Sequence, residues 1–141
     1  MSTHLQLIIM FTIVSYNSDG LAADRFDFIG SLCNDFDFIM IQETWLLTEN
    51  LCIFHDRFRF MSCHGVSAMD SRQISVGRPH GGGSILWRSN LTCKITPLDS
   101  DNTRVCAILI ELSNMKILLV NVYMPTDTRF DSSNVSLFND V

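Results

Sequence analysis

The stretch FIMIQETWL, residues 38–46, is an apolar run that ends in Glu43 instead of in a turn. Glutamate is a poor strand residue and is costly to bury, so a carboxylate at the end of a hydrophobic segment usually has a partner or a task. Upstream, residues 5–16 form a continuous apolar run that the turn sequence NSDG stops. Between the two runs, apolar residues recur at helical spacing at Leu21, Ala22, Phe26, Ile29, Leu32 and Cys33. This pattern predicts a strand, a helix and a second strand with short connections, which is a parallel crossover unit.

The ends of these elements carry the first candidate site. Ser18 or Asp19 is expected to cap the start of the helix, and the pair at 34–35 (Asn-Asp) is expected to end it. In crossover units, functional groups collect at the carboxyl ends of the strands. Asn17 and Glu43 both occupy such ends, so we expect an amide and a carboxylate side by side at one rim of the sheet.

The last three-fifths of the chain is predicted to be mostly sheet. Residues rich in strand formers occur in five segments: RFRFMSC (57–63), GSILWRS (83–89), LTCKIT (91–96), RVCAILIEL (104–112) and KILLVNVYM (116–124). Residues 65–83, which end in VGRPHGGG, are expected to form a long loop, and long loops in compact domains are commonly functional. A short helix is expected from Asp131 onward.

Length and composition indicate one globular domain. The chain has 141 residues, of which 47% are apolar and 18% are charged. A net charge of −5 gives no overall attraction for nucleic acid. The charge is segregated, however, with one base against eight acids in residues 19–56 and six bases against one acid in residues 57–94. Such segregation either places an acidic edge beside a phosphate-facing patch or is ordinary surface unevenness.

Cysteine usage and the amino terminus bear on location. Five cysteines without a C-x-x-C pair are typical of free thiols in a reducing compartment. Zinc binding by Cys52, His55, Cys63 and His64 is disfavoured, because adjacent residues on a strand point to opposite faces. Residues 5–14 have the length of a signal-peptide core, but no Lys or Arg precedes them and they are too short to cross a bilayer. We expect an intracellular protein, nuclear or cytoplasmic, without a membrane partner.

Taken singly, the candidate residues allow two interpretations. Glu43 could coordinate Mg²⁺ in an open site, since that ion keeps several waters and takes one or two carboxylates, but an isolated surface glutamate is the more frequent finding. Tyr123, in NVYMP, could donate its hydroxyl to a phosphoryl oxygen or be a half-buried packing residue.

Four segments in order remove part of this ambiguity. SYNSDGL, FDFIMIQETWL, GRPHGGGSILWRS and ILLVNVYMPTD resemble the amino-terminal part of the endonuclease/exonuclease/phosphatase superfamily, which has the deoxyribonuclease-I-like fold. More narrowly, QETWL, GRPHGGGSILWR and NVYMP are similar to the endonuclease domain of non-LTR retrotransposons, which also encode a reverse transcriptase. The resemblance implies an α/β fold, a four-layer sandwich of two packed β-sheets flanked by helices. It makes residues 1–141 a truncated, amino-terminal portion of one such domain.

The resemblance also implies roles for single residues. Glu43 matches the metal-binding glutamate, Asn17 matches the asparagine that orders the metal and scissile phosphate, and Tyr123 matches the tyrosine that supports the phosphate. The implied cofactor is Mg²⁺ or Mn²⁺. Thr126 stands where related repair endonucleases carry Asn after the Pro of the tyrosine motif. The candidate DNA contacts are Arg78, Arg88 and Thr126.

The implied reaction is metal-assisted hydrolysis that nicks target DNA and leaves a 3′-hydroxyl. In retroelements this end primes copying of the element RNA by the reverse transcriptase, which is not present in this chain. The later Asp/Asn and Asp-His motifs of the family have no match here, so weak or absent activity is expected. The alternatives are another phosphoesterase of the superfamily, acting on inositol phosphates, lipids or nucleotide messengers, and a secreted or binding module without catalysis.

Overall fold

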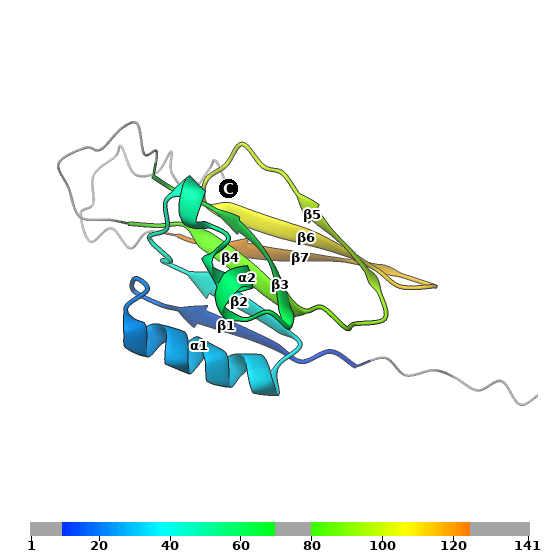
Figure 1. The fold of residues 1–141 in the computed structure, drawn as a ribbon. Helices are drawn as coiled ribbons and strands as arrows, with labels where there is room; N and C mark the ends of the chain where they lie inside the picture. The colour runs from blue at the N-terminus through cyan, green and yellow to red at the C-terminus, as the bar shows by residue number, and fades with distance from the viewer. Residues whose placement is uncertain (1–9, 70–79, 125–141) are drawn as a thin grey trace, which may run out of the picture.

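The computed structural model describes residues 10–69 and 80–124, which fold into two sheets with helices on one side (Figure 1). The elements in chain order are β1 (Ile13–Asn17), α1 (Ala23–Asp35), β2 (Phe38–Gln42), the 3₁₀ turn η1 (Thr48–Asn50), α2 (Ile53–Arg57), β3 (Met61–Val66), β4 (Gly83–Arg88), β5 (Lys94–Leu98), β6 (Val105–Glu111) and β7 (Lys116–Val122).

The first sheet has the strand order β1-β2-β4-β3, and the second has the order β5-β6-β7. β1 and β2 are parallel, with Asn17 paired to Gln42, and α1 connects them. The remaining pairs, in both sheets, are antiparallel. The parallel crossover predicted from the opening third of the sequence is therefore confirmed.

The first sheet is buried on both faces. Side chains alternate along β2 and β4, so that Ile39, Ile41 and Leu86 face the helices and pack with the apolar face of α1. Phe38 and Ile85 point the other way and pack against the second sheet. Burial on both sides explains why FIMI reads as a continuous apolar run instead of an alternating one.

The second sheet is covered on its inner face only, within the part of the chain that the structure describes. Cys106, Ile108 and Ile110 of β6 point inward and are buried, and they join the cluster between the two sheets. On the outer face of β7, Leu118 is 58% exposed and Val120 is 38% exposed. The mixed α/β class with two packed sheets is thus confirmed, while the outer helical layer of the expected four-layer sandwich is not observed in the described ranges.

Two local predictions are wrong. Residues 57–60 were expected to start a strand, but Arg57 ends α2 and β3 begins only at Met61. The helix arises because Phe54 and Phe58 are four residues apart, which brings both rings to the core, and the Phe58 N–H donates to the Phe54 carbonyl at 2.8 Å. The alternating letters RFRF concealed this helical spacing.

The expected cap of α1 is also wrong. The N-cap position is Ala22, which makes no side-chain cap. The Ser18 hydroxyl instead donates to the carbonyls of Gln42 and Glu43, at 3.0 Å each, because the chain after β1 turns back over the end of β2. The helix ends at Asp35, as predicted.

Several expectations fall partly or wholly outside the described ranges. They concern the strand residues before Met10, most of the loop 65–83 and the helix from Asp131. In the described part of the chain, the helices are too short or too polar to cross a membrane.

Candidate functional site

The ends of β1 and β2 meet at one rim of the first sheet. Asn17 is the last residue of β1, and Glu43 follows directly after β2. The Ser18 N–H donates to the Gln42 carbonyl at 2.9 Å, and the Gly20 N–H donates to the Glu43 carbonyl at 2.8 Å. These main-chain bonds join the two loops, so the amide of Asn17 and the carboxylate of Glu43 come from adjacent strand ends, as the sequence indicates.

The backbone around Glu43 has an unusual conformation. Glu43 and Trp45 have φ values of 56° and 54°, in the left-handed region that few residues other than glycine adopt. Thr44, between them, is buried, and the Trp45 N–H donates to the Gly81 carbonyl at 3.0 Å. Each such residue costs about 1–3 kcal/mol and persists only when its surroundings enforce it, which is most common at functional sites.

The carboxylate of Glu43 is held by three hydrogen-bond donors. Its Oε2 atom accepts from Trp45 Nε1 at 2.8 Å and from the Gly81 N–H at 3.0 Å, and the side chain also accepts from the Tyr123 hydroxyl. Burial by itself would raise the pKa of Glu43, but these three bonds and the nearby His80 together lower it below its usual value. Glu43 is therefore an oriented anion at neutral pH.

Tyr123 reaches this carboxylate from the second sheet. It follows β7, and its N–H donates to the Arg104 carbonyl at 3.0 Å. Burial, together with the hydrogen bond to Glu43 and the negative charge of Glu43, raises the pKa of Tyr123 to about 12, against a smaller opposing effect of Arg104. The phenol is therefore a protonated donor at neutral pH, and the rim combines groups from both sheets.

Arg88, a candidate DNA contact, lies at the opposite end of the first sheet. Because β4 runs antiparallel to β2, its last residue lies beside the beginning of β2. The guanidinium donates to the Phe36 carbonyl at 3.1 Å and to the Asn34 carbonyl at 2.6 Å, and its Nε lies 3.4 Å from Asp37 Oδ1. Arg88 thus fixes the carboxyl end of α1 and is not brought together with Glu43. Arg78 and Thr126 lie outside the described residues.

Sequence reasoning missed the residues that orient Glu43 and Tyr123. Trp45 and Gly81 donate to the carboxylate, and neither was singled out, although both lie in the quoted motifs. Asn121 was missed as well, and a signal for it existed, since it is a polar residue at a buried position of the apolar segment KILLVNVYM.

The rim carries one carboxylate and one amide that could serve as oxygen ligands of a cation. Within residues 10–69 and 80–124, no group of three or more His, Cys, Asp and Glu side chains is arranged to hold a metal ion. Mg²⁺ needs fewer protein ligands, because it retains waters and takes one or two carboxylates together with phosphate oxygens. The anionic Glu43 and the exposed amide of Asn17 at the next strand end fit such a site.

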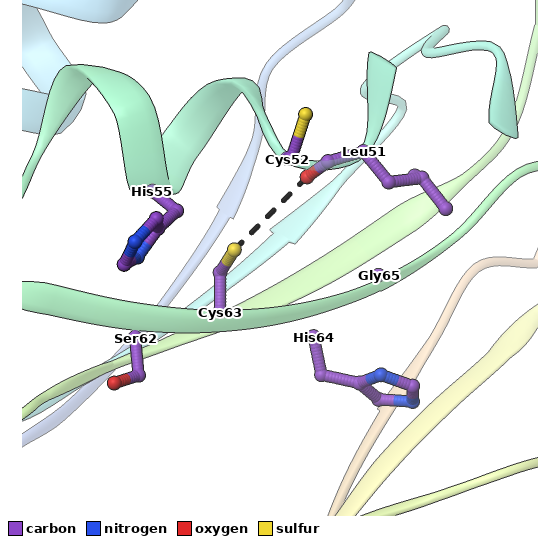
Figure 2. Close-up of a pocket in the computed structure, with 7 residues that line it drawn as sticks. All are labelled: Leu51, Cys52, His55, Ser62, Cys63, His64 and Gly65. Carbon is purple, nitrogen blue, oxygen red and sulfur yellow. Dashed lines mark hydrogen bonds between the residues drawn. The ribbon is translucent and has the colours of Figure 1, made fainter. Parts of the chain in front are cut away.

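The cysteine and histidine residues considered for zinc line a separate pocket of about 500 Å³ between α2 and β3 (Figure 2). Cys63 points toward the Leu51 carbonyl, whereas His64 points to the other face of the strand, with its Nε2 3.2 Å from the Leu98 carbonyl. Burial raises the pKa of Cys63, which favours the thiol over the metal-binding thiolate.

Comparison with solved structures identifies the fold. A 3′ phosphatase from Neisseria, NExo (D146N), bound to a product DNA hairpin, superposes with a TM-score of 0.60 at 19% identity over 93% of this chain and 48% of its own. The endonuclease domain of TRAS1, a telomere-specific non-LTR retrotransposon, gives 0.58 at 13% identity over 92% and 52%. The AP endonuclease LMAP from Leishmania major gives 0.56 at 16% identity over 80% and 40%. No protein-family profile and no curated protein sequence matches the chain.

These likenesses show that the chain shares its fold with two nucleases and a DNA 3′ phosphatase, which is the fold that the resemblance in sequence implies. It has part of the deoxyribonuclease-I-like fold, with a four-stranded and a three-stranded sheet in the described residues. The chain spans about half the length of the solved proteins that it matches.

Proposed function

We propose that this chain forms the amino-terminal portion of a divalent-metal-dependent DNA endonuclease of the retroelement type. The observation that carries the proposal is the ionised carboxylate of Glu43, oriented by Trp45 and Gly81 and in contact with the Tyr123 hydroxyl at the rim of the sheet. A fold shared with solved nucleases supports it.

In this proposal Glu43 and Asn17 would hold Mg²⁺ or Mn²⁺ at the ends of β1 and β2, and the ion would supply Lewis-acid chemistry at the phosphoryl group. Trp45 and Gly81 hold the Glu43 carboxylate in one orientation. Tyr123 is protonated at neutral pH and donates to Glu43 in this structure, and the same hydroxyl could donate to a phosphoryl oxygen.

The retroelement assignment is supported by QETWL and GRPHGGGSILWR together with the structural match to the TRAS1 endonuclease domain. The partner would be target DNA, nicked to give a 3′-hydroxyl, and element RNA would be engaged through a reverse transcriptase. This places the protein in the nucleus or cytoplasm. The chain by itself is proposed to be weakly active or inactive, because it spans about half of the solved proteins.

A second candidate is a DNA end-processing phosphatase, which the match to the Neisseria 3′ phosphatase favours. The same rim would serve, since both reactions need a cation, an oriented carboxylate and a donor to a phosphoryl oxygen. The two candidates differ in the bond that is cut: an internal phosphodiester in the first and a terminal 3′ phosphate in the second.

Metal binding tests the core of the proposal without requiring turnover. Tb³⁺ replaces Mg²⁺ at carboxylate sites, and its emission is excited by a nearby tryptophan. We expect tryptophan-sensitised Tb³⁺ emission from the full chain, displaced by Mg²⁺ or Mn²⁺, and lost in Glu43→Gln. Glu49→Gln, an exposed carboxylate in η1, is the matched control and should leave the emission unchanged. Equal Tb³⁺ binding by Glu43→Gln and the native chain would contradict the proposal.

Activity then separates the two candidates. Any endonuclease activity that the chain retains should convert supercoiled plasmid slowly, with Mg²⁺, to a nicked form whose ends a polymerase extends directly. Release of inorganic phosphate from a 3′-phosphorylated hairpin, without plasmid nicking, would favour the phosphatase instead.

A further inference from the structure

A single amide, that of Asn121 in β7, joins the two sheets beside the candidate site. Asn121 faces inward among apolar neighbours and is only 2% exposed. A buried amide is costly unless its donors and acceptor are satisfied, so its hydrogen bonds define what it does.

The amide makes bonds to two strands of the first sheet. Its Nδ2 donates to the Ile41 carbonyl at 2.8 Å and to the Ser84 carbonyl at 3.0 Å, and these two residues are paired across β2 and β4. Since both acceptors are carbonyls, the nitrogen and not the oxygen of the amide must face them.

The amide oxygen continues the network toward the rim. Asn121 Oδ1 accepts from Gln42 Nε2, which also donates to the Ser15 hydroxyl of β1 at 3.0 Å. One side chain of β7 is thereby connected to β1, β2 and β4, three of the four strands of the first sheet.

Space for this amide depends on a glycine. A Cβ atom at Gly83 would lie 3.2 Å from Asn121 Nδ2, closer than such contacts normally are. Gly83 is paired with Gln42, so the surface of the first sheet is flat where the amide lies across it. The last glycine of HGGG thus serves the contact between the sheets.

The hydrogen-bonded bridge between Asn121 and Gln42 lies next to both Glu43 and Tyr123 in the sequence. Gln42 directly precedes Glu43, and Asn121, in β7, lies two residues before Tyr123, which follows the end of that strand. We propose that Asn121 is a positioning residue, which fixes β7 against β2 so that the Tyr123 hydroxyl meets the Glu43 carboxylate. Its effect on metal affinity rests on the proposed function, whereas its effect on the geometry does not.

A merely structural role makes a different prediction. If the amide only satisfies buried carbonyls, its loss lowers the free energy of unfolding but leaves the surroundings of Glu43 unchanged in the folded protein. The indole N–H of Trp45 reports on those surroundings, because it donates to Glu43 Oε2. The chain has two tryptophans, so its ¹H–¹⁵N spectrum contains two indole signals, and Trp87→Phe assigns them.

The experiment compares Asn121→Leu, which keeps the approximate volume and removes the amide, with Tyr123→Phe, which removes the hydroxyl bound to Glu43. We expect the Trp45 indole signal of Asn121→Leu to move toward its position in Tyr123→Phe. The Tb³⁺ dissociation constant should rise by roughly 10- to 100-fold, as is usual when a residue supporting a metal ligand is lost. Ile108→Val, a buried change in β6 at a side chain that has no hydrogen-bonding group, should change neither the Trp45 indole signal nor the Tb³⁺ dissociation constant.

Gln42→Leu keeps the proposal testable if Asn121→Leu does not fold, since it cuts the same bridge at its partly exposed end. A folded Asn121→Leu or Gln42→Leu protein with a native Trp45 indole signal would overturn the positioning role. If the native chain binds no Tb³⁺ while the indole signal moves as expected, the proposed function fails and the positioning role stands.

Discussion

The sharpest prediction concerns Gly20, which lies under the ring of Trp45. A Cβ atom at this position would be 2.3 Å from Trp45 Cε3 and 2.6 Å from Cζ3, and the residue has a φ of 86°. Gly20→Ala therefore strains the backbone and displaces the indole. Because the indole donates to Glu43, a change of one methyl group at a position remote in sequence should disturb the candidate site.

The magnitude follows from two contributions. An alanine in the left-handed region costs about 1–2 kcal/mol. A contact of 2.3 Å cannot be absorbed by small movements, so the ring must move and the hydrogen bond to the Glu43 carboxylate is lost. A hydrogen bond to a charged group contributes about 1.5–3 kcal/mol. We therefore expect Gly20→Ala to lower the free energy of unfolding by about 2.5–5 kcal/mol, a large share of the 5–15 kcal/mol typical of domains.

Urea denaturation followed by circular dichroism measures this loss, and the Trp45 indole signal reports the displaced ring. Gly30→Ala is the matched control. Its Cβ would meet Phe58 Cε1 at 3.3 Å, a tight contact that offsets the gain of about 1 kcal/mol in helix propensity, so little net change is expected. A loss below about 1 kcal/mol in Gly20→Ala, with a native indole signal, would refute the packing of Trp45 over Gly20.

Three further predictions follow from the same structure. Absorbance titration of the two tyrosines should show Tyr123 ionising at a pKa of about 12. Glu43→Gln should lower this pKa only in part, because burial, the largest cause of the shift, remains. The contribution of Tyr123 to stability is complete below pH 10 and lost as pH rises through 12. An unchanged Tyr123 pKa in Glu43→Gln would contradict the contact. Arg88→Ala should lower the free energy of unfolding, measured in urea, by about 1.5–3 kcal/mol. Arg88→Lys should not restore this stability, because an ammonium group cannot reproduce the planar guanidinium that donates to several acceptors at once. Full restoration by lysine would argue against that geometry. The exposed apolar face of the second sheet should promote self-association of the chain, and Leu118→Lys on this face should reduce it in sedimentation experiments. The same substitution should change the free energy of unfolding by less than about 0.5 kcal/mol. An unaltered sedimentation profile would count against this face as the surface through which copies associate.

The sequence was informative where apolar residues repeat over a whole element. The run FIMI is long enough for a buried strand, and Phe26, Ile29, Leu32 and Cys33 are all buried on one face of α1. From these two elements the parallel crossover follows, and so does the adjacency of the strand ends that carry Asn17 and Glu43, because connection handedness and strand direction leave few alternatives.

Short elements and the pairing of strands distant in sequence could not be predicted from such apolar repeats. In α2, of five residues, alternation and helical spacing could not be told apart, because Phe54 and Phe58 belong to both patterns. The sequence could not show how far Arg88 lies from Glu43, because an antiparallel strand takes its two ends to opposite edges of the sheet. The left-handed backbone of Glu43 had no signal in the letters at all, since glycine is the residue that usually marks it.

The network of Asn121 has a consequence for the order of events during synthesis. Its bonds to Gln42 and Ile41 connect residues 79 and 80 positions apart, and Tyr123 emerges later still. Strands near the amino terminus can pair and bury their helix while the ribosome is still adding the second sheet, whereas contacts of such long separation form late. A nascent chain therefore carries Glu43 without its phenol partner until β7 has docked, so the full affinity proposed for a cation at this rim would be reached only as the last of the described strands is completed.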